Sequence, residues 1–244
     1  MKKFILTVLG YILIICLFVV CINEGYKLLD RTGKTKFENI PEGLQICNLG
    51  SSHGLFGYNY ETICDEYTCF NFSLESQSLS YDYRILVNYQ DRLQENAIVF
   101  ITVSYFSFFG RDEIDEDNFE SKNQRYYKFL PAELIKQYDW TTSFYVAKFP
   151  ALADCETLVR VFRGQNWNVK DWSEYSSWQQ TVDPEKAAES AKSAYYRHIV
   201  GGKTDVDGER VYNQEEIEAL YDIIALCRER DAIPVRERSS SSSA

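Results

Sequence analysis

The stretch that decides the fold is Ile46-Cys47-Asn48-Leu49-Gly50-Ser51-Ser52-His53-Gly54. An apolar run over 44–49 stops there at small residues that include two serines and one of the chain's two histidines. A buried strand that ends here and leads into a helix places a serine hydroxyl at the carboxyl edge of a sheet, where open α/β folds bind their ligands. The alternative is a plain strand-to-helix turn in which Ser51 or Ser52 only caps the helix.

Two further apolar runs, over 68–72 and 97–104, follow the first run over 44–49. Between them, the segment from Ser78 to Glu95 carries apolar and aromatic residues at helical spacing. Continuous apolar strands suit a parallel sheet that is covered on both faces, and strand–helix alternation implies right-handed crossovers. The sequence therefore predicts an α/β fold with a three-layer, flavodoxin-like, doubly wound parallel sheet.

The N-terminus predicts a membrane anchor. Lys2 and Lys3 precede nineteen uncharged residues, 4–22, which would reach about 28 Å as a helix, close to the roughly 30 Å hydrocarbon core of a bilayer. No Ala-x-Ala cleavage site follows, and Phe18-Val19-Val20 before Cys21 lacks the small residue of a lipoprotein signal. We expect an uncleaved single-pass helix in the cell membrane, with a cytoplasmic N-terminus and an extracytoplasmic main domain from about residue 24. A cleaved signal is the alternative.

The charge of the chain argues against nucleic-acid binding. Lys2 and Lys3 are two of the 26 basic residues, so the part beyond the apolar run carries 24 basic against 36 acidic residues, a net charge of −12. A surface of this sign is repelled by phosphate backbones and is not drawn to anionic lipid by charge. We therefore expect the apolar helix, not a basic patch, to hold the protein at the lipid bilayer.

The cysteines do not predict a disulfide framework or a metal site. Two of the seven lie in the apolar run, which leaves an odd number outside it, and no Cys/His spacing is typical of zinc. A bridge between Cys64 and Cys69 is conceivable, but we do not predict it. The acidic run over 112–117 lacks the alternating acids and the turn glycine of a calcium loop. We expect no metal and no cofactor.

Changes in pattern along the chain predict its domain organisation. The final helix begins with Asn213 as its cap and Glu216 as the second residue of a capping box. Its expected buried face comprises Ile217, Leu220, Tyr221, Ile224 and Cys227. The predicted segments are 1–23 (cytoplasmic N-terminus and transmembrane anchor), 24–43 (linker), 44–105 (first part of the α/β domain), 106–211 (helical, aromatic insertion), 212–235 (last helix and start of the next strand) and 236–244 (disordered Ser-rich tail).

The order of motifs resembles the SGNH (GDSL-like) hydrolase superfamily. The motifs are Leu49-Gly50-Ser51-Ser52-His53, then Asn71-Phe72-Ser73 with Gln77, then a long helix and a strand that ends in Val103-Ser104-Tyr105. The chain is most similar to the membrane-anchored, extracytoplasmic branch, which includes the D-alanyl transfer protein of lipoteichoic acid synthesis and surface O-acetyltransferases. The resemblance covers 44–105 and, more loosely, 214–235. It implies that Ser52, the third residue of Gly-x-Ser, is the catalytic nucleophile and that Ser51 stands where Asp is common.

At the positions of the family's other site residues, this chain has different residue types. A glycine after the second strand and an asparagine after the third supply oxyanion donors in the family, whereas this chain has Ser73 and Ser104 in those places. An amide near Ser73 or the side chain of Gln77 is the expected substitute. Gly50 and the amides of the following helix complete the expected oxyanion site, and Ser51 and His53 lie in the same pocket.

The resemblance also implies a base that this sequence lacks. The family's Asp-x-x-His lies beyond the strand that begins near Ile233, but no histidine follows His198. The sequence therefore predicts an α/β domain that is incomplete at its C-terminus and has a truncated or out-of-frame ending.

Two functions follow from this reading. The first is a membrane-anchored esterase or O-acyltransferase that acts on an acylated cell-surface polymer or glycan. The second is a catalytically inactive surface binding or assembly protein that retains the scaffold. Neither involves nucleic acid.

Overall fold

The computed structural model describes residues 2–29, 37, 39–60, 62–74, 76–108, 123, 125–153, 184–195 and 212–238. The chain forms two compact units, one of 1–39 with 119–174 and the other of 40–118 with 175–244. The acidic run over 112–117 and His198 lie outside the described residues.

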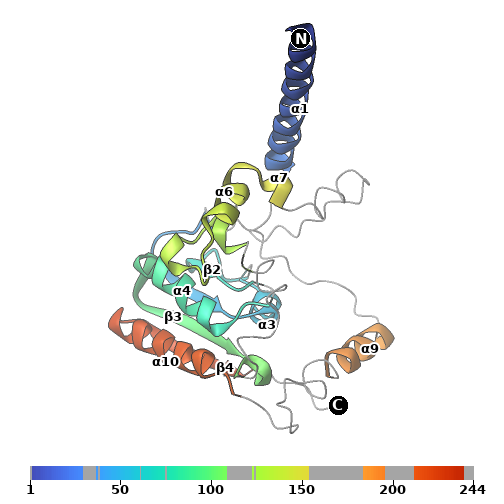
Figure 1. Ribbon diagram of the computed structural model, residues 1–244. Helices are drawn as coiled ribbons and strands as arrows, with labels where there is room; N and C mark the ends of the chain where they lie inside the picture. Colours follow the sequence, from blue (N-terminus) through green and yellow to red (C-terminus); the bar gives the residue numbers. More distant parts are fainter. Residues whose placement is uncertain are drawn as a thin grey trace. The chain divides into compact units, whose positions relative to one another are not determined.

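The elements are labelled in Figure 1. The helices are α1 (Lys2–Leu29), α3 (Ser52–Gly57), α4 (Leu79–Tyr89), α6 (Trp140–Lys148), α7 (Pro150–Ala153), α9 (Pro184–Tyr195) and α10 (Gln214–Glu229). The strands are β1 (Leu44–Leu49), β2 (Cys69–Asn71), β3 (Leu93–Val103) and β4 (Ile233–Arg238). Short 3-10 helices cover Gln90–Arg92, Tyr105–Phe108, Tyr126–Lys128 and Ala132–Leu134.

The second unit is built on a four-stranded sheet in the order β2-β1-β3-β4, and every neighbouring pair is parallel. β1 is central, with Cys47 opposite Phe70 of β2 and Val99 of β3. The chain moves outward from β1 to β2 and then crosses back over β1 to β3, so the order of the strands reverses between β1 and β3. This is the flavodoxin-like order of a doubly wound sheet. The predicted α/β class is confirmed.

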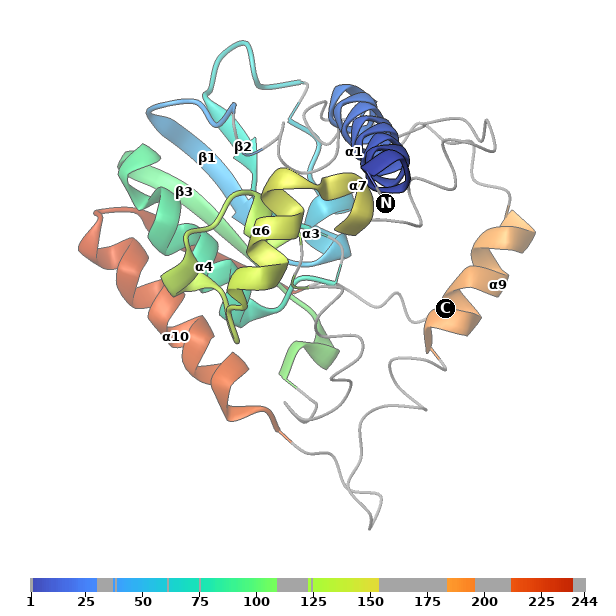
Figure 2. The same ribbon diagram turned by 45° about the horizontal axis from the view of Figure 1, so that its top comes forward.

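Helices cover both faces of this sheet. Neighbouring residues of a strand point to opposite faces, as do Cys47 and Asn48 of β1. The thiol of Cys47 lies near that of Cys227 in α10, whereas the amide of Asn48 donates to the carbonyl of Gly54 in α3. α10 and α3 therefore lie on opposite faces. α4 packs against α10, and Figures 1 and 2 show the two helices running side by side along the sheet.

The boundaries of α4, β3 and β4 differ from the predicted ones. The helix expected over 78–95 ends at Tyr89, and β3 already begins at Leu93, which pairs with Leu44 of β1. Leu93 fits the helical spacing, but pairing with β1 decides its structure. The last strand was expected to stop at residue 235, yet β4 continues to Arg238. Its polar residues stay in the ladder because strand pairing uses the backbone, and an outer strand tolerates charged side chains.

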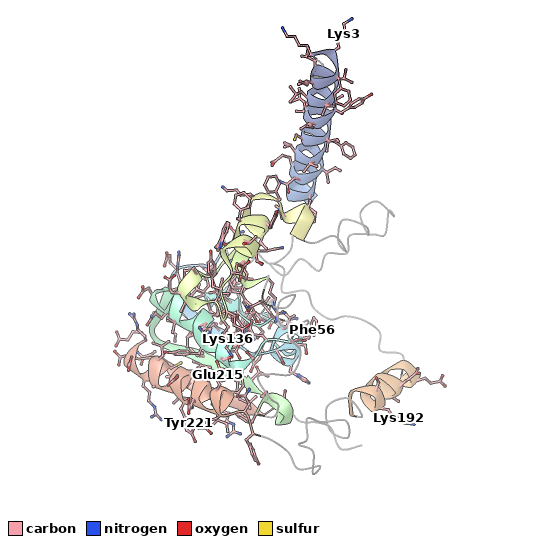
Figure 3. The ribbon with its side chains drawn as sticks, viewed as in Figure 1. Lys3, Phe56, Lys136, Lys192, Glu215 and Tyr221 are labelled. Carbon is pink, nitrogen blue, oxygen red and sulfur yellow. The ribbon has the colours of Figure 1, made fainter. Side chains whose placement is uncertain are left out.

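The packing of α10 agrees only in part with the prediction. Asn213 caps the helix as expected, since its side chain accepts from the amides of Glu215 and Glu216. The buried face is rotated from the predicted one and consists of Glu216, Ala219, Leu220, Ile223 and Cys227. Tyr221 was expected inside but is 68% exposed, and Figure 3 labels it on the outer side of the helix.

The first unit contains the apolar helix α1, which is long and apolar enough to cross a membrane. Asn23 follows the apolar run and is buried. Its amide donates to the carbonyl of Lys148 over 2.8 Å, and its Oδ1 accepts from the amide of Ala151 over 3.4 Å. These bonds tie α1 to the junction of α6 and α7, so 119–174 and the N-terminal segment form one unit. Elsewhere in this unit, Phe37 stacks on Phe129 with ring centroids 3.8 Å apart.

Candidate functional site

The turn from β1 into α3 depends on Gly50. Its φ is +135°, a conformation that residues with a side chain rarely adopt. A Cβ added at Gly50 would lie 2.7 Å from the Cβ of Thr102, so the turn is in tight contact with β3. The amide of Gly50 donates to Oδ1 of Asp82 over 2.8 Å. The backbone that leads to the two serines is therefore fixed by both β3 and α4.

Ser52 is the first residue of α3 and comes directly after the carboxyl end of the central strand. It is half-buried, and none of the residues that the structure describes forms a hydrogen bond with its hydroxyl. Ser51 is the N-cap, and its carbonyl accepts from the amide of Leu55, but its side chain makes no capping bond. The interpretation of Ser51 as a side-chain cap is therefore wrong. The half-buried hydroxyl of Ser52 is therefore not held in place by any described residue.

A buried polar cluster lies beneath α3. Its centre is the fully buried Asn48 of β1, whose Nδ2 lies 2.8 Å from Oγ of Ser73 and 3.0 Å from Oδ1 of Asn71. Oδ1 of Asn48 accepts from the hydroxyl of Tyr60 over 2.9 Å. Nδ2 of Asn71 donates to the carbonyl of Gly54 in α3 over 3.2 Å. We call these five residues the Asn48 cluster; it ties β1, the end of β2 and α3 together and leaves no polar atom of Asn48 unpaired.

Ser73 belongs to this cluster through its backbone amide and its hydroxyl oxygen. Its amide donates to Oδ1 of Asn71 over 2.9 Å, and its hydroxyl oxygen accepts from Asn48. Ser73 is fully buried. The amide of Ser73 itself is thus already paired with Asn71.

Gln77 is also engaged below the turn. Its Nε2 donates to Oδ1 of Asp82 over 2.5 Å and to the carbonyl of Phe72 over 3.3 Å, which occupies both N–H groups. Its Oε1 is buried and has no partner among the described residues. Gln77 is therefore close to the Gly50 turn as predicted, but its donors hold Asp82 and the chain after β2.

Asp82 is a residue of this site that sequence reasoning missed. It lies in the first turn of α4 and is fully buried. Burial raises the pKa of its carboxyl to about 8, the hydrogen bonds from Gln77 and Gly50 oppose the rise, and the charge of Glu216 adds to it. The carboxyl is thus mostly protonated at neutral pH. In the sequence it looks like an ordinary acid at a helix N-terminus, so no local signal marks it.

Glu216 joins α10 to the start of α4. Its two carboxylate oxygens accept from the amide of Ser80 over 3.0 Å and from the Ser80 hydroxyl over 2.8 Å. The predicted capping box, in which Glu216 would bond back to its own helix, is replaced by this cap on a neighbouring helix. The negative charge stabilises the N-terminus of α4.

His53 faces the end of β3. Its Nδ1 lies 3.4 Å from Oγ of Ser104, which is only 2% exposed, and the amide of Ser104 donates to the hydroxyl of Ser107 over 3.0 Å. Loss of hydration on this side lowers the pKa of His53 below 6.5. The lowered pKa favours the neutral ring, which can accept a proton. The structure thus brings Gly50, Ser51, Ser52 and His53 to one sheet edge, but it directs His53 toward Ser104.

Within the described ranges, no group of three His, Cys, Asp or Glu side chains is arranged to hold a metal ion. Cys64 and Cys69, both in those ranges, are thiols and do not form a disulfide with each other.

A scan against protein-family models, a search of curated proteins and a search of solved structures each found no match.

Proposed function

We propose that this chain is a membrane-anchored, extracytoplasmic esterase or O-acyltransferase in which Ser52 is the nucleophile. The observation that carries the proposal is the place of Ser52 at the carboxyl end of the central strand, half-buried and with a hydroxyl that no described residue engages. The reversal of strand order between β1 and β3 is where doubly wound sheets bind their ligands. The resemblance to SGNH hydrolases supports the same assignment.

The chemistry is an acyl transfer in two steps. Oγ of Ser52 attacks the carbonyl carbon of an acyl ester, a base takes the hydroxyl proton, and the tetrahedral oxyanion collapses as the alcohol leaves with a proton. A water or a second hydroxyl then takes the acyl group from Ser52. The first amides of α3 have no partner within the helix, so they support the oxyanion.

The substrate class follows from the anchor and the resemblance. A helix such as α1 would hold the catalytic unit at the outer face of the membrane, within reach of acylated polymers or glycans of the cell surface. Because the chain is strongly acidic, we expect a substrate that is not an extended polyanion.

A second candidate function is a non-catalytic binding or assembly module on the same scaffold. The observation in its favour is that neither an imidazole nor a carboxylate contacts the hydroxyl of Ser52 within the described residues, because His53 is directed toward Ser104. A serine hydroxyl without a base is a weak nucleophile.

Labelling with a fluorophosphonate probe distinguishes the two candidate functions; it is done on the full-length chain in detergent micelles. We expect the wild type to be labelled and Ser52→Ala to lose the label. Ser143→Ala is the matched control, because Ser143 is also a half-buried helical serine, in α6, and its loss should leave labelling unchanged. Labelling that survives Ser52→Ala refutes the assignment. A folded wild type with neither labelling nor ester turnover supports the second candidate.

A further inference from the structure

We propose that α6 lies on the membrane surface, with an aromatic face made by Trp140, Phe144 and Tyr145 in the interfacial region of the bilayer that α1 crosses. The inference goes beyond the acyl chemistry, and it rests on the membrane anchor of the proposed function. All the residues that carry it belong to the first unit.

The first step is the attachment of α6 to α1. Asn23 is the first residue after the uncharged run over 4–22, so it marks the level at which α1 leaves the hydrocarbon core. Its side chain bonds the carbonyl of Lys148, the last residue of α6, and the amide of Ala151 in α7. Figure 1 shows α6 and α7 at the end of α1 that is remote from the N-terminus. The C-terminal end of α6 is therefore fixed at the expected membrane–water interface.

The second step is the composition of the exposed face. Trp140 is 71% exposed, Phe144 48% and Tyr145 44%, whereas Val146 on the other side of α6 is buried. Trp140, Phe144 and Lys148 recur every fourth residue, so they share one stripe of the helix. Large exposed aromatic groups next to each other mark an interaction surface. Trp and Tyr are the side chains enriched at membrane interfaces, and a Lys at the end of the stripe can reach the headgroups.

The third step is the length of α6. Phe144 is four residues from Lys148, about 6 Å along the helix, which fits a headgroup region roughly 5–8 Å thick on each side of the core. Trp140 is about 12 Å along the helix from the contact with α1, so it reaches this region when α6 lies flat on the membrane. This flat orientation is what the proposal commits to.

The fourth step is the local charge. The segment 125–153 contains four basic residues against two acidic ones, although the whole chain has a net charge of −10. The four basic residues are Arg125, Lys128, Lys136 and Lys148, and the two acidic ones are Glu133 and Asp139. The repulsion that the acidic composition creates against anionic lipid is thus absent from this segment. The charge of this segment is therefore compatible with a lipid bilayer in contact with the aromatic face.

Fluorescence quenching by lipid tests the proposal on the full-length chain in phosphatidylcholine vesicles. Trp167, Trp172 and Trp178 are replaced by Phe, so that Trp140 is the only tryptophan. We expect a blue-shifted emission and stronger quenching by lipids brominated near the headgroup end of the acyl chain than by lipids brominated near its methyl end. The matched control moves the tryptophan to α10 (Trp140→Phe with Tyr221→Trp), where the side chain is equally exposed but is flanked by Glu218 and Asp222. This control should remain unquenched.

A carbonate wash of the same vesicles separates the proposal from the anchor on which it rests. A chain that stays in the vesicles while Trp140 remains unquenched overturns the docking of α6 and leaves the anchor intact. Release of the chain by carbonate overturns both. Shielding of Trp140 from aqueous iodide without lipid quenching shows that protein covers the face and also overturns the proposal. If the triple Phe variant does not fold, the loss of lipid quenching from wild type to Trp140→Phe gives the same answer.

Discussion

The carboxyl ends of β1 and β3 lie side by side in the sheet, and a serine follows each strand closely, yet the two serines differ in their surroundings. Ser52, after β1, is half-buried, and no described residue bonds its hydroxyl. Ser104, after β3, is almost completely buried, and its Oγ lies beside Nδ1 of His53. The two serines at this sheet edge therefore differ in their burial and in the free bonding capacity of their hydroxyl groups.

The two strand ends are also coupled, since Gly50 of the first contacts Thr102 of the second and His53 of α3 contacts Ser104. Substitutions at these contacts therefore measure how much the β1 end and the β3 end each contribute to stability.

Gly50→Ala should have the largest effect, because it breaks the contact between the two strand ends. The positive φ and the clash with Thr102 together should lower the free energy of unfolding by about 3–5 kcal/mol. Chemical denaturation of the variant measures this loss. Gly57→Ala is the control, because nothing lies within 4 Å of an added Cβ there. Equal stability of the two variants would show that the turn is not pressed against β3.

Asp82→Asn should have the next largest effect, and it sharpens the account of how the β1 end is held. Asn keeps an acceptor for Gly50 and Gln77 but cannot ionise. In the wild type, with a pKa of 3.8 unfolded and about 8 folded, the folded state retains a proton that the unfolded state has lost. Stability therefore falls as the pH rises from about 4 to about 8.

Asp82→Asn should remove this slope and leave the variant more stable than the wild type above pH 8. Thermal unfolding across the pH range is the measurement. A slope that persists in the variant would place the responsible titration elsewhere.

His53→Gln should have the smallest effect and tests the link to the β3 end. Because burial beside Ser104 lowers the pKa of His53 in the folded state, the unfolded state takes up a proton first as the pH falls. Wild-type stability should thus decline only slightly below pH 6.5, since the ring is partly exposed. The Gln variant should lack this decline in an acid titration followed by circular dichroism. An unchanged decline would mean that His53 is not desolvated at Ser104.

The sequence predicts those features that depend on neighbouring residues. The bounds of β1 were predicted correctly, because an apolar run that ends at Gly50 is a local signal. The cap at Asn213 was predicted for the same reason. Asp82 and Glu216 could not be predicted, because they bond residues 32 and 136 positions away. Ser73 and Gln77 can donate to an oxyanion only if their N–H groups are not already hydrogen-bonded within the protein. The sequence does not show which N–H groups are bonded, because the partners are set by the packing of the folded chain.

The most direct test of the central claim is to trap the acyl group on the chain. The full-length protein is mixed briefly with p-nitrophenyl acetate, quenched in acid, digested and examined by peptide mass spectrometry. Our account predicts one acetyl group on Ser52, the serine at the open end of β1. An acetyl group on Ser104 or another residue, or ester hydrolysis that leaves Ser52 unmodified at every time point, would contradict it.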